Sequence, residues 1–278
     1  QNNEVKLIQN LFAPCSESPI DLIRVAINFL DASKVKALLD SLKGLEYDVA
    51  LNLMQSSGYP PDDYISLLEE LGSWDSIDIL YFADSLGNMD STEVTRILNL
   101  SKEHWEGEIG FHAHNNRGFA LSNSLVAIEN GASWCDGTIL GMGRGAGNTP
   151  MENLLLSLQD SGLLDFDPGS LYELIEGDFL LLQNKYNWGP NLSYHYAALS
   201  KIHPTFVQRL LSEKRYDTEQ VLSALKYLSD IDARSYNQDL LRTAVFPLDE
   251  DQQKGTWDAT GWLEGREVLI IGAGPSVT

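Results

Sequence analysis

The stretch Gly110-Phe111-His112-Ala113-His114-Asn115-Asn116 decides the fold, because an apolar run ends there in two alternating histidines. On an extended strand alternate side chains share one face, so His112 and His114 are predicted to lie roughly 6 to 7 Å apart on the same side. Both imidazoles can then reach one cation at about 2.1 Å. The run turns polar directly after the pair, which places both histidines at the carboxyl end of the strand. In an α/β barrel that end is the catalytic face.

Outward from this stretch, short apolar runs alternate with amphipathic segments of helical period, a pattern typical of β/α units. Runs rich in Val, Ile and Leu predict strands covered on both faces, at Val5–Asn10, Leu22–Ile27, Asp48–Met54, Ile77–Asp84, Ile109–His114 and Trp134–Ile139. Helices are predicted between them. One is capped by Asp90 with Glu93 in the capping-box position, and another spans Phe119–Asn130 and ends at Gly131. A closed parallel barrel needs about eight strands, so we predict an α/β fold, a TIM (β/α)8 barrel that lacks its first two strands.

After Thr149 the strand signal disappears and helical patterns take over. Helices are expected at about residues 150–161, 169–186, 191–213 and 217–230. We therefore expect a partial barrel with strands three to eight over residues 1–161, a helical extension over 162–242 and a linker over 243–265. Residues 266–278 form an apolar run that enters a glycine turn, which predicts the truncated start of a second, Rossmann-like α/β domain. The chain is expected to be a fragment of a longer polypeptide.

The composition excludes several classes of partner. Among 278 residues, 19 Lys and Arg face 40 Asp and Glu, a net charge of −21, so nucleic acid is excluded as a ligand. No apolar run approaches the roughly 20 residues that cross a bilayer, and no signal pattern opens the chain, so we expect a soluble, cytoplasmic protein. Cys15 and Cys135 lie far apart without a C-x-x-C spacing and are expected to be small buried side chains.

Three motifs in order carry a family resemblance. They are the Gly110–Asn116 stretch, Tyr81-Phe82-Ala83-Asp84-Ser85-Leu86-Gly87-Asn88-Met89 before it, and Gly141-Met142-Gly143-Arg144-Gly145-Ala146-Gly147-Asn148 after it. Together they resemble the metal-dependent aldolase branch of the pyruvate carboxyltransferase superfamily, to which HMG-CoA lyase is related. The pattern is most similar to that of the 4-hydroxy-2-oxovalerate aldolases. The resemblance spans about residues 5–161, and a weaker likeness continues through the segment that contains Tyr194.

The resemblance implies that His112 and His114 bind a divalent metal, with Mn²⁺ favoured and Mg²⁺ or Co²⁺ as alternatives. It also implies that Asn148 approaches this metal. The family's third protein ligand is an aspartate on the first barrel strand, preceded by an arginine, and neither is in this chain. Two simpler interpretations stay open: the histidines could be ordinary polar residues of a barrel interior, and Asn148 could be the N-cap of a helix that begins at Thr149.

The remaining site residues would contact the substrate. The resemblance places Asp84 and Ser85 near a keto acid and matches Tyr194 to an active-site tyrosine, while Arg144 is a candidate for a carboxylate or phosphate contact. Asp84 could equally cap the turn that follows it, and Tyr194 could be a packed amphipathic side chain.

The activity implied is that of a divalent-metal-dependent aldolase, which cleaves or forms a C–C bond to a pyruvate enolate with a 4-hydroxy-2-oxo acid as substrate. Two alternatives stay open: a Claisen-type acyltransferase of the isopropylmalate or citramalate synthase kind, and a catalytically silent barrel that serves as a scaffold. The expected partners are a small 2-oxo acid, further copies in a homo-oligomer and the fused downstream domain. This chain alone is expected to be inactive.

Overall fold

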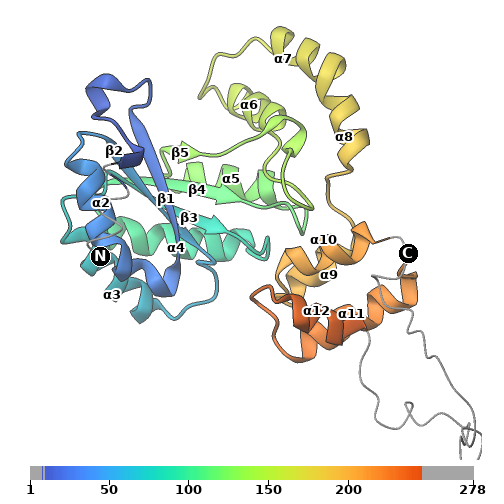
Figure 1. The fold of residues 1–278 in the computed structure, drawn as a ribbon. Coiled ribbons are helices and arrows are strands. Elements are labelled where there is room, and N and C mark those ends of the chain that lie inside the picture. Colours follow the sequence, from blue (N-terminus) through green and yellow to red (C-terminus); the bar gives the residue numbers. More distant parts are fainter. Residues whose placement is uncertain (1–7, 9, 214, 246–278) are drawn as a thin grey trace, which may run out of the picture.

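The computed structural model describes residues 8, 10–213 and 215–245. Its centre is one parallel sheet whose five strands follow chain order, with helices between them (Figure 1). The strands are β1 (Leu22–Asn28), β2 (Asp48–Met54), β3 (Ile79–Asp84), β4 (Glu108–Ala113) and β5 (Trp134–Cys135). The 3-10 turn η1 (Cys15–Glu17) precedes β1, and the elements between the strands are η2 (Phe29–Val35), α2 (Lys36–Lys43), α3 (Pro61–Gly72), α4 (Ser91–His104) and α5 (Ala120–Glu129). This arrangement confirms the predicted α/β class.

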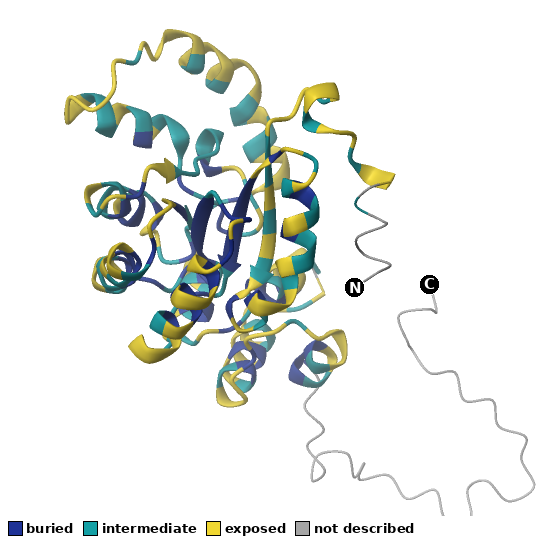
Figure 2. Ribbon diagram, turned by 90° about the vertical axis from the view of Figure 1, so that its left-hand side faces the viewer, coloured by how far each residue is buried: buried dark blue, intermediate teal, exposed yellow. Residues whose placement is uncertain are grey.

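Successive side chains along each strand point alternately to the two faces of the sheet. Residues such as Leu51, Phe82 and Phe111 point outward and pack with the helices in the main hydrophobic core. Their neighbours Ala50, Ile79 and Tyr81 point to the other face, where they form a smaller cluster of their own. Figure 2 shows the buried strands in the centre and the exposed surfaces of the helices outside them. His112 lies one residue beyond Phe111, so it belongs to the inner face.

The sheet is strongly curled. In a flat sheet, β1 and β5 would lie four strand spacings apart, or roughly 19 Å at about 4.8 Å per spacing. That separation exceeds the combined reach of an arginine and an aspartate, yet Nη1 of Arg24 on β1 lies 2.7 Å from Oδ2 of Asp136, directly after β5. The inner face is therefore concave, as in part of a barrel.

The first predicted strand, Val5–Asn10, is wrong for its described residues, since Ile8 and Asn10 are helical. The amide of Phe12 donates to the carbonyl of Ile8, and both side chains pack against the main core. A hydrogen bond between residues four apart in the sequence is that of a helical turn, whereas a strand bonds to a neighbouring strand. The last predicted strand, Trp134–Ile139, is shorter than expected, because β5 ends at Cys135 and Ile139 opens the 3-10 turn η3 (Ile139–Gly141).

The predicted caps are confirmed in part. Asp90 caps α4 by accepting a hydrogen bond from the amide of Glu93, but the Glu93 carboxylate does not close a capping box. It accepts from the amide of Gly58 and pairs with Arg96 instead. Gly131 follows α5 with φ of 93°, as expected for a left-handed C-terminal residue.

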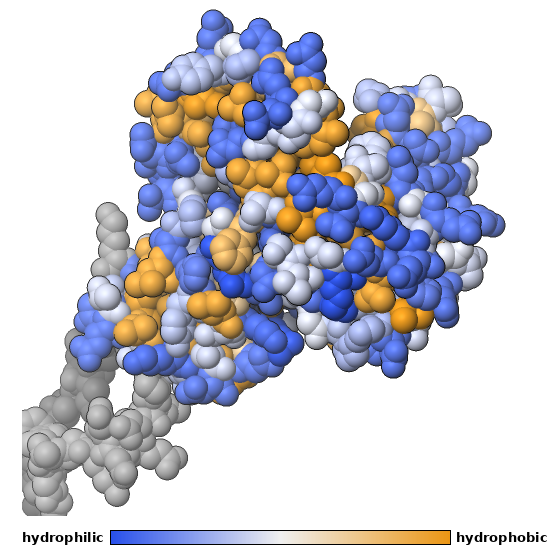
Figure 3. Space-filling view, turned by 180° about the vertical axis from the view of Figure 1, so that it is seen from behind, coloured by the Kyte–Doolittle hydropathy of each residue, from blue (hydrophilic) through white to orange (hydrophobic). Residues whose placement is uncertain are grey.

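The helices that follow the sheet form two parts. The first is an arm of α6 (Met151–Asp160), which lies in the expected barrel segment, and of α7 (Gly169–Leu174), the π-helical turn η4 (Ile175–Phe179) and α8 (Leu180–Tyr186), which open the expected helical extension. No residue of α7, η4 or α8 is buried, and apolar side chains gather where the arm meets the sheet (Figure 3). The second part is a bundle of α9 (Leu192–Leu199), α10 (Pro204–Ser212), α11 (Thr218–Asp230) and α12 (Gln238–Val245) with its own core.

The single helix predicted over 191–213 is wrong. It divides into α9 and α10 because Lys201 adopts a left-handed conformation (φ 55°) and Pro204 cannot continue a helix. Residues 243–245 of the expected linker belong to α12, while the rest of the linker and the expected second domain at 266–278 lie outside the described residues. In the part that the structure describes, no helix is both long and apolar enough to span a membrane.

Candidate metal centre

The two histidines of the decisive stretch lie together, as predicted. His112 is on the inner face of β4, and His114 follows one residue after the strand ends. Their ring centroids are 5.1 Å apart and the ring planes meet at 84°. The separation is slightly smaller than the strand period predicts, because β4 has ended and His114 instead forms an isolated antiparallel bridge with Asn148. The pair lies at the carboxyl end of the sheet.

His114 is electrostatically suited to donate a lone pair. Burial lowers the pKa of His114 to about 3, and the neighbouring His112 and Arg144 act in the same direction. The imidazole is therefore neutral at physiological pH. A neutral imidazole is the form that binds metals.

The glycine loop lies against this pair. The amide of Asn115 donates to the carbonyl of Gly147 at 2.8 Å, so the loop and the histidine stretch are joined through their backbones. Gly147 has φ of 82°, and a Cβ there would lie only 2.1 Å from the carbonyl oxygen of Gly141. Only glycine fits this close backbone approach.

Asn148 ends the glycine loop with one half of its amide unsatisfied. Its Nδ2 donates to the carbonyl of Met142 at 3.1 Å, whereas its buried Oδ1 has no hydrogen-bond partner among the described residues. The N-cap interpretation is wrong, because α6 begins at Met151 with Pro150 as its N-cap and no side-chain cap. A buried carbonyl oxygen without a partner is unfavourable unless a ligand supplies one.

These donors fit a divalent cation. Two imidazoles and one amide oxygen supply nitrogen and oxygen ligands of the kind that Mn²⁺, Mg²⁺ or Co²⁺ accept. Among residues 8, 10–213 and 215–245, no group of three or more His, Cys, Asp and Glu side chains is arranged to hold a metal. The candidate set therefore rests on His112, His114 and the unsatisfied oxygen of Asn148.

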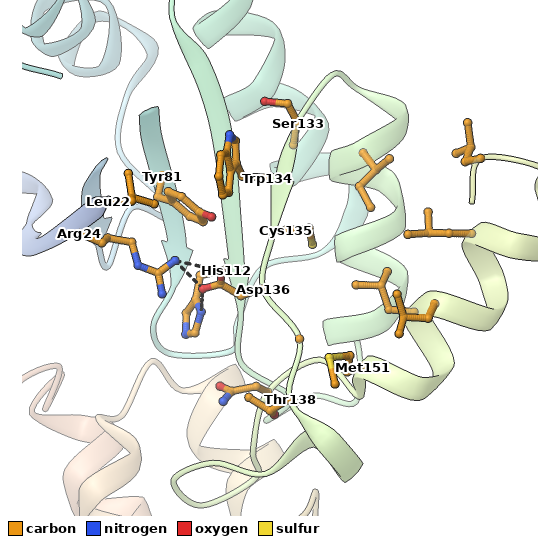
Figure 4. A pocket seen from close by; sticks show the side chains of 18 residues that line it. Leu22, Arg24, Tyr81, His112, Ser133, Trp134, Cys135, Asp136, Thr138 and Met151 are labelled. Atoms are coloured by element: carbon orange, nitrogen blue, oxygen red, sulfur yellow. Dashed lines mark hydrogen bonds and ion pairs between the residues drawn. The ribbon is translucent and has the colours of Figure 1, made fainter. Parts of the chain in front are cut away.

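Asp136 is a member of the site that the sequence patterns did not reveal. Its Oδ2 lies 2.7 Å from Nδ1 of His112, and both of its oxygens contact Nη1 of Arg24 (Figure 4). Burial favours a higher pKa for Asp136, but the hydrogen bond with His112 and the charge of Arg24 outweigh it and hold the pKa below its usual range. The available signal was a carboxylate at the carboxyl end of the last strand, at the level of the first histidine.

Asp84 and Ser85 are not brought to this site as free groups. Asp84 is 1% exposed, and its two oxygens accept hydrogen bonds from the amides of Asn88 and Met89. It thus caps the turn that follows it, which was the simpler interpretation. The hydroxyl of Ser85 accepts a hydrogen bond from the amide of Gln55 in the loop after β2.

Arg144 and Tyr194 lie where the bundle meets the glycine loop. The ring of Tyr194 on α9 packs so closely over Gly145 that a Cβ there would be 2.7 Å from it. Burial raises the pKa of Tyr194, and Arg144 opposes this rise. Arg144 is exposed, and its contact is Nη1 to Oγ1 of Thr205 at 3.4 Å. No sequence pattern pointed to His203, which also lies here: burial and the charge of Arg144 lower the pKa of His203 to about 4.

A cavity of about 890 Å³ opens beside His112 (Figure 4). Its polar wall includes Arg24, Tyr81, His112, Asp136 and Asn148. Its apolar wall comes from α5, β5 and α6, and it includes Ile128, Trp134, Met151, Leu154 and Leu158. The volume suits a small organic molecule, with polar groups gathered at one end.

Comparisons with known proteins agree with the motifs. A 4-hydroxy-2-oxovalerate aldolase of Thermus thermophilus is 33% identical over 165 residues, which are 58% of this chain and 46% of that protein. An oxaloacetate decarboxylase of Mycobacterium tuberculosis is 27% identical, over 58% of this chain and 48% of that protein. The chain thus spans about half the length of these curated relatives.

Solved structures support the same fold. The N-terminal domain of a Bacteroides vulgatus protein assigned as an aldolase superimposes with a TM-score of 0.66 and 32% identity, covering 73% of this chain and 67% of that one. The carboxyl transferase domain of Rhizobium etli pyruvate carboxylase, solved with pyruvate, gives a TM-score of 0.69 at 16% identity, covering 90% of this chain and 46% of that one. The latter likeness concerns the fold alone.

A protein-family model described as HMGL-like matches residues 12–174. This match covers more than half of the chain and contains both histidines and the glycine loop. The chain therefore belongs to the HMGL-like family.

Proposed function

We propose that this chain carries the metal-binding part of a divalent-metal-dependent aldolase, which forms or cleaves a C–C bond to a pyruvate enolate. The observation that carries the proposal is the pair His112 and His114 beside the unsatisfied Oδ1 of Asn148. The substrate class proposed is a 4-hydroxy-2-oxo acid, in line with relatives named 4-hydroxy-2-oxovalerate aldolase at 33 and 34% identity.

His112, His114 and Asn148 would hold the ion, with Mn²⁺ as our first choice and Mg²⁺ or Co²⁺ as alternatives. A bound divalent ion would supply Lewis-acid chemistry, polarising the keto group of a 2-oxo acid and stabilising the negative charge that develops at the carbon beside it. The protein's own contribution is to keep the His114 imidazole neutral by burial and to fix both rings at one strand end, where Asp136 contacts Nδ1 of His112.

The groups around the ion suit an anionic substrate. Arg144 is exposed and has no carboxylate partner in the described part of the chain, so its guanidinium is free to bind a substrate carboxylate. The raised pKa of Tyr194 keeps its phenol protonated, and the group can donate a hydrogen bond at its hydroxyl. We propose these two residues as substrate-binding and catalytic, respectively. Asp84 and Ser85 instead support the turns that carry the site.

The test is a pyruvate-release assay on the intact protein with a panel of 4-hydroxy-2-oxo acids, with and without a chelator. We expect pyruvate release that the chelator abolishes and Mn²⁺ restores. His112→Ala should abolish it while the circular dichroism spectrum stays unchanged. His104→Ala is the matched control, because His104 ends α4 away from the cavity. Unchanged activity in His112→Ala would remove this residue from the mechanism, and pyruvate release from oxaloacetate alone would replace the aldolase assignment with decarboxylation.

A further inference from the structure

One array of side chains crosses the concave face beneath the histidine pair. Arg24 stands on β1, His112 on β4, and Asp136 directly after β5, so the array joins the two edges of the five-stranded sheet. The backbone amide of Asp136 also donates to the carbonyl of Phe111 at 3.2 Å, which fixes Asp136 beside the strand that carries His112. Arg24 and Asp136 are 112 positions apart in the sequence, and together they act on the imidazole of His112.

The chemistry of the array determines which ring nitrogen of His112 carries a proton. Asp136 faces the Arg24 guanidinium through both carboxylate oxygens, at 2.9 and 2.7 Å, and an ionised carboxylate can only accept hydrogen bonds. Its Oδ2 lies 2.7 Å from Nδ1 of His112, so Nδ1 must be the donor. Nε2 of His112 is then the nitrogen with a free lone pair.

Arg24 is itself held in place. Its guanidinium carbon lies 4.6 Å from the ring centre of Tyr81, in a stacked cation–π contact visible in Figure 4. The ring of Tyr81 reaches this position because Gly110 faces it, and a Cβ on Gly110 would be 2.5 Å from the ring. Gly110 precedes His112 by two residues on the same strand face. The strand that carries the histidine therefore also makes room for the support of its partner.

We propose that Asp136, clamped by Arg24, is a positioning residue that holds His112 in the Nδ1–H tautomer and leaves Nε2 for the cation. This inference rests on the proposed function for the identity of the ligand, but the tautomer is a property of the metal-free protein. His114 has no carboxylate partner among the described residues, and its hydrogen-bond partner is the backbone of Gly147. The two imidazoles are thus held by different groups: His112 by a carboxylate, and His114 by the glycine loop.

The experiment uses the intact, metal-free protein with ¹⁵N-labelled histidine, in which long-range ¹H–¹⁵N NMR spectra distinguish Nδ1–H from Nε2–H rings. In the wild type we expect His112 as Nδ1–H. In Asp136→Asn the amide can donate to Nδ1, and we expect a population of Nε2–H with the His114 signals unchanged. Loss of such an outer-shell partner typically weakens metal binding by about 10- to 100-fold, and we expect a Mn²⁺ affinity loss of that size by electron paramagnetic resonance titration.

Two further variants test the role of the Arg24 clamp and provide a control. Arg24→Met leaves Asp136 in place but removes its clamp, and we expect a smaller affinity loss than in Asp136→Asn. Asp78→Asn is the matched control, because it breaks the Lys43–Asp78 ion pair at the opposite end of the strands and should leave the tautomer and the Mn²⁺ affinity unchanged. If Asp136→Asn does not fold, Arg24→Met decides by the same two measurements.

A His112 ring that stays Nδ1–H in the folded variants, with Mn²⁺ affinity within twofold of the wild type, overturns the proposal. Failure of the proposed function gives a different result: a wild type that binds no Mn²⁺ and releases no pyruvate, whatever the tautomer. An Nε2–H ring in the wild type also overturns the positioning role, even if Mn²⁺ binds.

Discussion

Gly110→Ala tests how the inner face of the sheet is built. Gly110 on β4 is the Cα partner of Tyr81 on β3, and a Cβ there would lie 2.5 Å from three atoms of the Tyr81 ring. Carbon atoms in contact stay about 3.5–4.0 Å apart, so the ring must retreat by about 1 Å or more. The ring borders the cavity and can move into it, but only by displacing the Arg24 guanidinium stacked on it.

Overpacking of this kind destabilises a protein by about 1–3 kcal/mol. At roughly 2–4 °C per kcal/mol for a domain of this size, the unfolding midpoint should fall by about 2–12 °C in differential scanning calorimetry. Mn²⁺ affinity should fall as well, because Arg24 holds Asp136 in place. Gly177→Ala is the control: a Cβ on this helical glycine meets nothing within 4 Å, so stability should not fall.

A second substitution separates the clash from other effects of the alanine. Tyr81→Leu removes the ring, and in the double variant with Gly110→Ala the two destabilisations should be smaller than their sum. A Gly110→Ala protein with wild-type stability and wild-type Mn²⁺ affinity would refute the close approach of the two strands. Additive effects in the double variant would refute Tyr81 as the residue that Gly110 accommodates.

Three other outcomes follow from individual side chains. Burial raises the pKa of Asp84 from 3.8 to about 7, so the folded protein binds this proton more tightly and stability falls as the pH rises through that window, by up to about 1.4 kcal/mol per pH unit. Asp84→Asn should remove this slope in urea unfolding, and equal slopes in both proteins would contradict the assignment. Burial and Arg144 lower the pKa of His203 from 6.5 to about 4, so stability is lost as the pH falls through that window, and His203→Gln should flatten the acid limb of unfolding midpoints between those pH values. Asn148→Ala loses only the bond to Met142, about 0.5–1.5 kcal/mol, while Mn²⁺ affinity should fall at least about 10-fold; unchanged affinity would exclude Asn148 as a ligand.

Local sequence patterns predicted most of the fold. Alternating apolar runs predicted the parallel strands from β1 to β4, and Asp90 and Gly131 marked helix ends that the structure confirms. One error arose because a pattern was too short to show its period. The segment Val5–Asn10 was too short for its sequence to distinguish a strand from a helix. Ile8 is helical in the structure, and it packs against the main core together with Phe12, one helical turn later.

The residues of the candidate site also fall into those that local sequence patterns could predict and those that they could not. His112 and His114 were predictable because their proximity follows from strand geometry over three residues. Asp84 and Asn148 were ambiguous in sequence, since each could serve a turn or a ligand, and only the structure shows that one is saturated by amides while the other keeps a free oxygen. The one local signal for Asp136 was its position directly after the last strand, and His203 gave none, because the roles of both depend on residues distant in the chain.

The Arg24–Asp136 ion pair makes the proposed metal binding depend on the curvature of the sheet. The two residues stand on edge strands that only a curled sheet brings together, and Asp136 in turn contacts His112. A change that flattens the sheet would therefore separate the pair and release the imidazole before any strand is lost. Conversely, a cation held by His112 would stabilise the curled form, since a ligand that binds one conformation more tightly shifts the population toward it. The curvature of the sheet and the geometry of the candidate metal centre are thus one linked property of this protein.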